Sequence, residues 1–384
     1  MTSCRPLKIG FMPLVDAASL FIAVDKGFAA AEGLDIELVR EVSWSNIRDR
    51  LAVGHYDAAH LLAPMAIAAT LGLNQVKAPL VAPFNLAMNG NAITVSRHLH
   101  ARLVEAANGD LADPSVSARA LHTIIYEDER RGAEPLTFGM TFPFSLHNYQ
   151  LRYWMAEAGV NPDEDLRLVV LPPPFMAESL AKGQLDGFCV GAPWNAVAAE
   201  AGVGVILHPA CDIFHPAPEK TLALRESMAN SDPSVVVALI NACLNATDFI
   251  HAPENRAEVA SVLARPDRVG VEARTIRAIL DTSLNVTVER GARSNLIFGD
   301  RVVGRPEPYQ AAWLYGQMAR WGQARLSREA LGISKDVFDP AFFDKAAGVK
   351  AATAPSPITA FAGPAFTGDA LETYIAAFAI SSRS

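Results

Sequence analysis

Charge is scarce in this sequence and is not concentrated anywhere. Only 19% of the 384 residues are Asp, Glu, Lys or Arg, and the formal net charge is -8. No run of Lys and Arg, and no patch of interleaved basic and aromatic residues, offers a surface for a nucleic-acid backbone. We therefore expect no direct binding of nucleic acid. A small buried anion stays open as a ligand, because it needs only one or two local positive groups.

Long hydrophobic runs are missing as well. The longest apolar stretch, residues 61–73, is shorter than the ~20 residues of a membrane-spanning helix. Residues 1–11 lack the charged region, the apolar core and the small-residue cleavage site of a signal peptide. The sequence thus predicts no membrane partner and a cytoplasmic location.

Cysteine motifs and catalytic motifs are also absent. The four cysteines, Cys4, Cys189, Cys211 and Cys243, form no CxxC pair and no Cys/His array with zinc spacing. We expect free thiols, no metal and no other cofactor. The sequence has no Walker-type glycine loop, no HExxH and no Gly-x-Ser-x-Gly, which predicts that the protein is not an enzyme.

Apolar residues, in contrast, are abundant, and their pattern predicts the fold. They make up 51% of the chain, and 384 residues are about twice what one hydrophobic core organises, so two lobes are expected. Short apolar runs alternate with helical patterns, which is typical of an α/β layer structure with a mostly parallel sheet. The first strands are expected at 7–11, 34–39 and 58–61, with helices at 20–30, 46–53 and 65–70.

A second series of the same kind follows, and helices dominate after it. Strands are predicted at 137–140, 166–171 and 187–190, helices at 146–158 and 175–181, and later helices at 234–250, 256–264, 271–280 and 308–320. The Ala-, Pro-, Thr- and Ser-rich segment 347–364 is expected to be extended and loosely held before a last helix at 369–378.

Several short segments occur in the order of a known family. They are GFMPLVD (10–16), KGF (26–28), VSWSN (42–46), DAAHLLAPM (57–65), NGNAI (89–93), TFP (141–143), His147, RYW (152–154), GAPWN (191–195) and PEK (218–220). In this order, they resemble the solute-binding proteins of bacterial nitrate and bicarbonate ABC transporters. The resemblance covers residues 7–225, with a weaker echo at 361–380.

This resemblance implies a fold and a division of the chain. The family has the type II periplasmic-binding-protein fold, an α/β architecture in which two lobes enclose a ligand cleft. The first lobe would comprise residues 1–94 plus 206–384, and the second residues 95–205. Because the chain begins almost at its first strand, it resembles most the cytoplasmic nitrate/nitrite sensors of the family. Such a sensor holds an antiterminator-type response regulator protein, which is an RNA-binding antitermination regulator. It releases this partner when the anion arrives and the lobes close.

The resemblance also implies five ligand-binding residues: Trp44, Asn91, His147, Gly191 and Lys220. A nitrate ion stays charged and accepts hydrogen bonds weakly, so its site needs fixed donors, a positive charge and enclosure. The Trp44 indole donates without accepting. His147, at the start of a predicted helix, would add helix N-terminal donors and a protonated imidazole. At Gly191 the backbone can approach a small ligand closely.

The remaining two positions concern the size and the charge of the ligand. Asn91 stands where the transport receptors have a longer glutamine, so the pocket would differ in size. Lys220 matches the nitrate binders of the family, whereas the bicarbonate binders have an acidic residue there and use a metal. Without the resemblance, each of the five residues has an ordinary structural interpretation, such as a core tryptophan or a solvated lysine.

Two other functions stay open at this point. One is a substrate-binding receptor of a nitrate ABC transporter, which has the same site and another partner. The other is an enzyme like the pyrimidine synthases that share the fold. Those enzymes depend on a cysteine-rich motif that this chain lacks.

Overall fold

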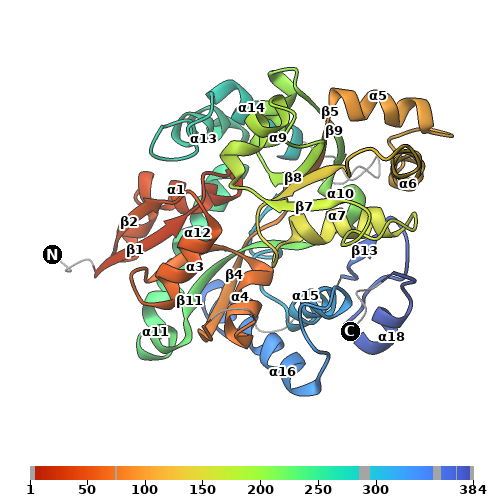
Figure 1. The fold of residues 1–384 in the computed structure, drawn as a ribbon. Coiled ribbons are helices and arrows are strands. Elements are labelled where there is room, and N and C mark those ends of the chain that lie inside the picture. The colour runs from red at the N-terminus through yellow and green to blue at the C-terminus, as the bar shows by residue number, and fades with distance from the viewer. Residues whose placement is uncertain (1–4, 74–75, 285–294, 349–355, 369, 381–384) are drawn as a thin grey trace.

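The computed structural model describes residues 5–73, 76–284, 295–348, 356–368 and 370–380. Its described strands form two large sheets and one short pair. Sheet A has the order β12-β4-β11-β3-β1-β2, and sheet B has the order β7-β6-β8-β5-β9. In Figure 1, sheet A and its helices lie at the left and bottom, and sheet B lies at the upper right. The two sheets carry the two α/β lobes that the sequence predicts.

The strands of sheet A come from three separate parts of the chain. They are β1 (Arg5–Phe11), β2 (Leu34–Arg40), β3 (Ala58–Leu62), β4 (Leu80–Asn89), β11 (Pro218–Arg225) and β12 (Leu296–Phe298). β1 pairs in parallel with β2 and β3, whereas β11 is antiparallel to β3 and β4, and β12 is antiparallel to β4. β3 and β11 are almost wholly buried, since helices cover both faces of the sheet.

Sheet B is built from the middle of the chain. Its strands are β5 (Asn91–Ser96), β6 (Thr137–Met140), β7 (Arg167–Val170), β8 (Gly187–Gly191) and β9 (Gly204–Pro209). β6 is parallel to β7 and β8, and β5 is antiparallel to β8 and β9.

Both sheets are therefore mixed. Most strands of each sheet run in one direction, as the prediction of a mostly parallel sheet requires, and the strands that oppose this direction are β11 and β12 in sheet A and β5 in sheet B. The chain passes from β4 of sheet A to β5 of sheet B, and it returns from β9 of sheet B to β11 of sheet A. The neighbours β4 and β11, and likewise β5 and β9, therefore run in opposite directions.

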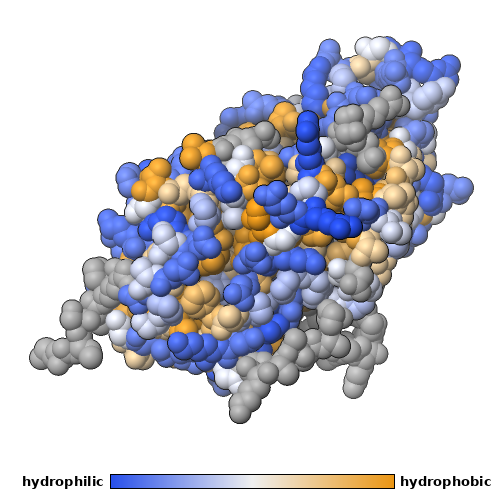
Figure 2. All heavy atoms as spheres, turned by 90° about the horizontal axis from the view of Figure 1, so that it is seen from below, coloured by the Kyte–Doolittle hydropathy of each residue, from blue (hydrophilic) through white to orange (hydrophobic). Residues whose placement is uncertain are grey.

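Helices surround both sheets. Those outside sheet B's part of the chain are η1 (Val15–Ala17), α1 (Ala18–Asp25), α2 (Phe28–Ala31), α3 (Trp44–Ala52), α4 (Ala63–Leu71), α11 (Glu226–Ser231), α12 (Pro233–His251), η3 (Pro253–Asn255), α13 (Arg256–Leu263), α14 (Ala273–Leu284), α15 (Pro308–Arg320), α16 (Arg328–Val337), α17 (Ala341–Ala347) and α18 (Leu371–Ala376). Those within it are α5 (Arg97–Ala106), α6 (Pro114–Arg131), α7 (Leu146–Ala156), η2 (Pro173–Phe175), α8 (Met176–Ala181), α9 (Trp194–Glu200) and, after β9, α10 (Ala210–Ile213). On the face seen from below, hydrophilic side chains surround smaller hydrophobic areas (Figure 2).

Among the described helices, α12 is the one long and apolar enough to cross a membrane by length and composition. Its buried side chains include Val236, Ile240 and Leu244, which belong to the hydrophobic core shared with β1, β4 and β11. A core helix of a large lobe has the same composition, so the length of α12 does not indicate a membrane span.

The sequence patterns locate most elements, with two instructive differences. The predicted helix 20–30 is divided into α1 and α2, because Gly27 between them has a φ of 76°, outside the right-handed helical region. The C-terminal segment is held more firmly than expected. There β13 (Thr359–Ala360) pairs with β10 (Phe214–His215), and the Phe361 ring packs edge-on against Tyr153, with 5.8 Å between centroids. Residues 349–355 of that prediction lie outside the described residues.

The predicted division of the chain, 1–94 plus 206–384 against 95–205, stays a prediction. Its boundaries fall within β5 and β9, the two strands of sheet B that adjoin the crossings. The cysteine prediction can be followed only in part, because Cys4 lies outside the described residues. Cys189 and Cys243 are buried free thiols.

Candidate ligand-binding site

Trp44 opens α3 and is buried. The helix begins there because the Ser43 hydroxyl caps it, accepting a hydrogen bond from the backbone N–H of Asn46 at 3.3 Å. Only 1% of Trp44 is exposed, and its ring centroid lies 5.5 Å from that of His60. The indole Nε1 has no hydrogen-bond partner among the described residues. The donor that the sequence predicts thus stays available to a ligand.

His147 occupies the same kind of position on α7. Ser145 caps this helix by accepting from the backbone N–H of Asn148 at 3.1 Å, and His147 is wholly buried in the first turn. The His147 Nδ1 lies 2.9 Å from the Thr141 hydroxyl, and Nε2 has no hydrogen-bond partner in the described chain. Burial and the nearby Lys220 lower the pKa of His147 well below its usual value. The predicted protonated imidazole is therefore wrong, and a neutral ring with one N–H replaces it.

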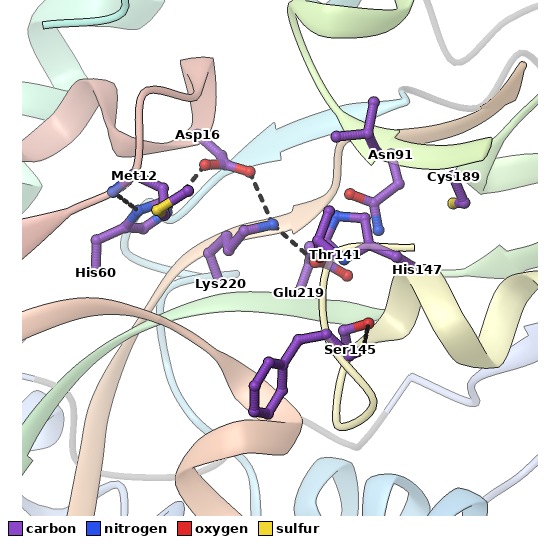
Figure 3. A network of polar contacts seen from close by, with 12 residues as sticks. Met12, Asp16, His60, Asn91, Thr141, Ser145, His147, Cys189, Glu219 and Lys220 are labelled. Atoms are coloured by element: carbon purple, nitrogen blue, oxygen red, sulfur yellow. Dashed lines mark hydrogen bonds and ion pairs between the residues drawn. The ribbon is translucent and has the colours of Figure 1, made fainter. Parts of the chain in front are cut away.

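Lys220 lies on β11, where its ammonium group is inserted between two carboxylates (Figure 3). The Nζ is 2.7 Å from Glu219 Oε1 and 3.1 Å from Asp16 Oδ2, and all three side chains are buried. Burial alone would lower the pKa of Lys220, but the two carboxylates raise it, so the amine stays charged. The positive charge predicted at this position is present, and it is already compensated by the protein itself.

Asp16 connects this lysine to a second histidine. The carboxylate follows β1 in η1, and its Oδ1 lies 2.9 Å from His60 Nε2 on β3. Burial would raise the pKa of Asp16, but Lys220 and His60 lower it to about 2. Burial lowers the pKa of His60, and its Nδ1 is placed to accept from the Met12 backbone N–H at 3.5 Å. Near neutral pH, Asp16 is therefore ionised and His60 is neutral.

Asn91 approaches from sheet B together with an amide that the sequence analysis did not select. The Asn91 Nδ2 donates to Gln150 Oε1 at 3.1 Å, and the Cys189 thiol lies 3.4 Å from the same oxygen. The Asn91 Oδ1 and the Gln150 Nε2 have no partner among the described residues, although both atoms are buried. Gln150 thus supplies an amide donor beside the asparagine that replaces the family's glutamine.

Gly191 ends β8 directly opposite Asn91 in the strand register. A Cβ at this position would lie 3.5 Å from Asn91 Oδ1 and 3.5 Å from Asp16 Oδ2. The backbone of Gly191 therefore borders the same buried polar cluster that contains Asn91 and Asp16.

The structure brings all five sequence-predicted residues to this cluster, at the junction of the two sheets. It also brings in residues that sequence reasoning missed, namely Asp16, His60, Gln150 and Glu219. Asp16, His60 and Glu219 lie inside family-like segments already noted, so their place in those segments was the available signal. Gln150 carried none, because a glutamine one helical turn after His147 resembles any polar helix residue.

Buried polar atoms without partners define the chemistry of this cluster. Trp44 Nε1, Asn91 Oδ1, His147 Nε2, Gln150 Nε2 and Glu219 Oε2 have no hydrogen-bond partner in the described chain. Each such atom costs about 1–3 kcal/mol when it stays unsatisfied, so a small polar ligand that supplies partners is favoured here. No group of three or more His, Cys, Asp and Glu residues in the described chain is arranged to hold a metal.

This arrangement and fold define a two-lobed binding protein, and comparisons with known proteins agree. The model of the NMT1-like family matches residues 3–264, and the chain belongs to that family. A crystal structure of the periplasmic nitrate-binding protein NrtA from Synechocystis superimposes with a TM-score of 0.86 at 24% identity, over 98% of this chain and 99% of that one. This match confirms the predicted two-lobed periplasmic-binding-protein fold.

Relatives in sequence carry related names. The nitrate/nitrite binding protein NrtA of Nostoc sp. is 31% identical over 363 residues, which cover 88% of this chain and 76% of that protein. The nitrate import ATP-binding protein NrtC of Synechocystis sp. is 34% identical, covering 88% of this chain and 49% of that one. The bicarbonate transport ATP-binding protein CmpC of the same organism is 34% identical, with coverages of 94% and 53%. The chain thus spans about half the length of these two transport proteins.

Proposed function

We propose that this chain binds nitrate or nitrite between its two lobes. The observation that carries the proposal is the buried cluster in which Trp44, His147 and Gln150 present nitrogen atoms without hydrogen-bond partners around Lys220. Indole and amide N–H groups donate, and the neutral His147 ring donates from Nε2 in the tautomer whose Nδ1 accepts from the Thr141 hydroxyl, so in that tautomer three donors accompany the cation. A planar oxyanion accepts from all of them. The names of the NrtA relatives support the same ligand class.

Contacts from both lobes link the ligand to lobe closure. Trp44 and Lys220 belong to elements around sheet A, whereas His147 and Gly191 belong to elements of sheet B. Asn91 opens β5, the strand of sheet B within which the proposed lobe boundary at residue 94 falls. An anion held by both groups favours the form in which the sheets are close together, because a ligand shifts an equilibrium only by its differential affinity. The division of the chain into lobes 1–94 plus 206–384 and 95–205 is part of this proposal.

The proposed biological role is that of a cytoplasmic sensor that controls an RNA-binding antitermination regulator. The anion site is compatible with this role, because release of a partner needs only that the ligand favours one of the two forms. If the regulator binds the open form, nitrate weakens that complex, and the regulator weakens nitrate binding by the same factor. No enzymatic step is needed in this mechanism.

A second candidate is the substrate-binding component of an ABC transporter. The alignment of almost the whole chain with half of NrtC and half of CmpC favours it, and nitrate and bicarbonate are then both candidate ligands. The anion site is common to the two roles, so the partner and the compartment separate them.

Titration calorimetry with nitrate, nitrite and bicarbonate tests the ligand. We expect saturable binding of nitrate or nitrite at one site per chain, and absence of binding by both to the folded protein would refute the proposal. Fractionation of native cells and affinity purification with and without nitrate then test the role. Recovery from the cytosol with a regulator that nitrate releases supports the sensor, whereas recovery with a permease supports the transporter.

A further inference from the structure

Glu219 has an oxygen that neither a hydrogen bond nor an ion pair of the described chain uses, whereas both Asp16 oxygens lie within ion-pair distance of His60 or Lys220. Its Oε1 lies 2.7 Å from Lys220 Nζ and 3.6 Å from His147 Nε2, which is too long for a hydrogen bond to the neutral ring. Its Oε2 is buried and has no hydrogen-bond partner in the described chain. An ionised carboxylate oxygen accepts hydrogen bonds and cannot donate, so it is the wrong group to face an anion unless it carries a proton.

The charges around Glu219 add a second reason why an ionised Glu219 and a bound anion are incompatible. The titratable groups that face it, or lie directly behind those that do, are Lys220 on β11, Asp16 in η1, His147 on α7, Cys189 on β8 and His60 on β3. Both histidines and the thiol are neutral, since burial lowers the pKa of each histidine and raises that of Cys189. Lys220 and Asp16 cancel each other.

The net charge of the cluster therefore depends on Glu219 alone. With Glu219 ionised it is -1, and a bound monoanion would make it -2 in a region that water does not reach. With Glu219 protonated, the occupied site carries only the charge of the ligand. Like charges at close range in a buried site repel strongly, so the protonated form is preferred when an anion is bound.

In the ligand-free protein, the surroundings of Glu219 already favour its protonated form. Burial raises the pKa of Glu219 above its usual value, and Asp16 acts in the same sense. Lys220 and the Asn91 amide act in the opposite sense without reversing the shift.

We propose that the protonation state of Glu219 depends on whether the ligand carries a proton of its own. A proton-free oxyanion such as nitrate binds together with one proton, which the Glu219 carboxyl group takes up. The protonated Oε2 then donates to the anion. A ligand that brings its own hydroxyl, such as bicarbonate, instead donates to the ionised carboxylate, and no proton is taken up from solvent. This inference rests on the proposed function and names the chemistry by which the same site separates two classes of anion.

The expected linkage is quantitative. Above the pKa of Glu219 in the free protein, nitrate affinity falls about tenfold for each unit of pH, because one proton must accompany each ion. Bicarbonate affinity does not follow this slope. Calorimetry of the wild-type protein in buffers of different ionisation enthalpy counts the protons directly, at several values between about pH 5 and pH 9.

Glu219→Gln provides the matched variant, since its amide is neutral and carries N–H donors at every pH. We expect it to bind nitrate with little dependence on pH, to take up no proton, and to bind bicarbonate more weakly than the wild type. The control is Glu178→Gln, which removes an exposed carboxylate of α8 that pairs with Lys182, the residue directly after that helix. This control should keep the wild-type slope and proton count.

The outcomes distinguish this inference from the proposed function. Nitrate binding without proton uptake at any pH in wild-type protein would overturn the inference and leave the nitrate site standing. A pH slope that persists in folded Glu219→Gln would also overturn it, because another group would then supply the proton. Failure of nitrate and nitrite to bind the folded wild type at any pH would refute the proposed function, and the inference with it.

Discussion

Two buried cations, Lys220 and Arg320, are accommodated in opposite ways. Lys220 is in contact with two carboxylates, and the pKa of its amine is raised. Arg320 has no carboxylate within ion-pair distance among the described residues, and burial lowers the pKa of its guanidinium. Its Cζ instead lies 3.8 Å from the ring centroid of Phe378, 4.6 Å from Trp321 and 4.9 Å from Tyr153.

The difference separates the proposed ligand site from a contact that holds the C-terminal segment in place. Arg320 ends α15, and its Nε donates to the Ile380 carbonyl at 3.2 Å, so it fastens the C-terminal segment to a cage of rings. The aromatic faces belong to the protein and stay in place. Buried polar atoms without described partners occur around both cations. Near Arg320 they are Arg320 Nη1, Trp321 Nε1 and the Gln317 amide, which all come from α15 and its C-cap, whereas around Lys220 they come from elements of both sheets. A buried charge therefore points to a ligand between the sheets where unsatisfied groups of both sheets converge on it.

The largest expected effect is the loss of nitrate binding in Lys220→Met. Removing the ammonium leaves Asp16 and Glu219 facing the anion without a cation between them, so affinity should fall at least about 100-fold, from the loss of a buried charge partner. Calorimetry measures the affinity, and thermal unfolding confirms that the variant is folded. Lys182→Met, which changes an exposed lysine, is the control. Unchanged affinity in folded Lys220→Met would remove Lys220 from the site.

Arg320→Ala should have the reverse profile. It removes a buried side chain with its ring contacts, and should lower the free energy of unfolding by about 3 kcal/mol. Nitrate affinity should stay within a factor of about two, because Arg320 touches none of the cluster residues. Urea unfolding and calorimetry measure the two quantities. A large loss of affinity at unchanged stability would show that the comparison between the two cations is mistaken.

The pH dependence of stability should distinguish the regions next. The pKa of His147 is lower in the folded protein than in the unfolded chain, so below about pH 6.5 the unfolded chain binds a proton that the folded protein does not. Stability therefore falls as pH decreases, and this residue contributes up to about 1.4 kcal/mol per pH unit. His147→Gln should flatten the slope in urea titrations between about pH 5 and pH 6.5, whereas Arg320→Ala should not. Equal slopes in all three proteins would show that His147 is not held neutral.

The smallest expected effect is that of Trp44→Phe. The ring is largely retained, and one hydrogen bond to the ligand is lost, which corresponds to about a tenfold weaker affinity. Fluorescence titration also tests whether nitrate quenches or shifts the Trp44 emission. Trp321→Phe, in the ring cage of Arg320, is the matched control and should keep the affinity. If Trp44→Phe keeps both the affinity and the nitrate-dependent signal, the indole serves only in packing.

The sequence could predict the positions of most helices and strands, but not the ion pairs and protonation states of the buried cluster. Local apolar patterns identify β1, β6 and α15 almost to the residue, because burial of one strand or one helix face is recorded in its own few residues. The mixed direction of the strands was not recorded there. It depends on where the chain crosses between sheets, which is a property of residues more than 100 positions apart, such as those of β4 and β11.

The candidate site shows the same division. Trp44 and His147 could be selected because each lies in a family-like segment, and each begins a helix after a capping serine. The pairing of Lys220 with Asp16 could not be identified, because Asp16 is about 200 positions distant in sequence and meets the lysine only through the pairing of β1, β3 and β11. The protonation of His147 was also mispredicted, since a sequence does not show that both sheets exclude water from the ring.

Gly191 has a further consequence, which concerns measurement. Its φ lies outside the left-handed region, and an added methyl group would be in ordinary contact distance of its neighbours at 3.5 Å. The fold itself therefore tolerates alanine at this position, and any penalty of Gly191→Ala falls on the molecule that occupies the cluster. A single methyl group at position 191 therefore gauges how closely the bound ion approaches the backbone, because the protein itself meets that group only at ordinary contact distance.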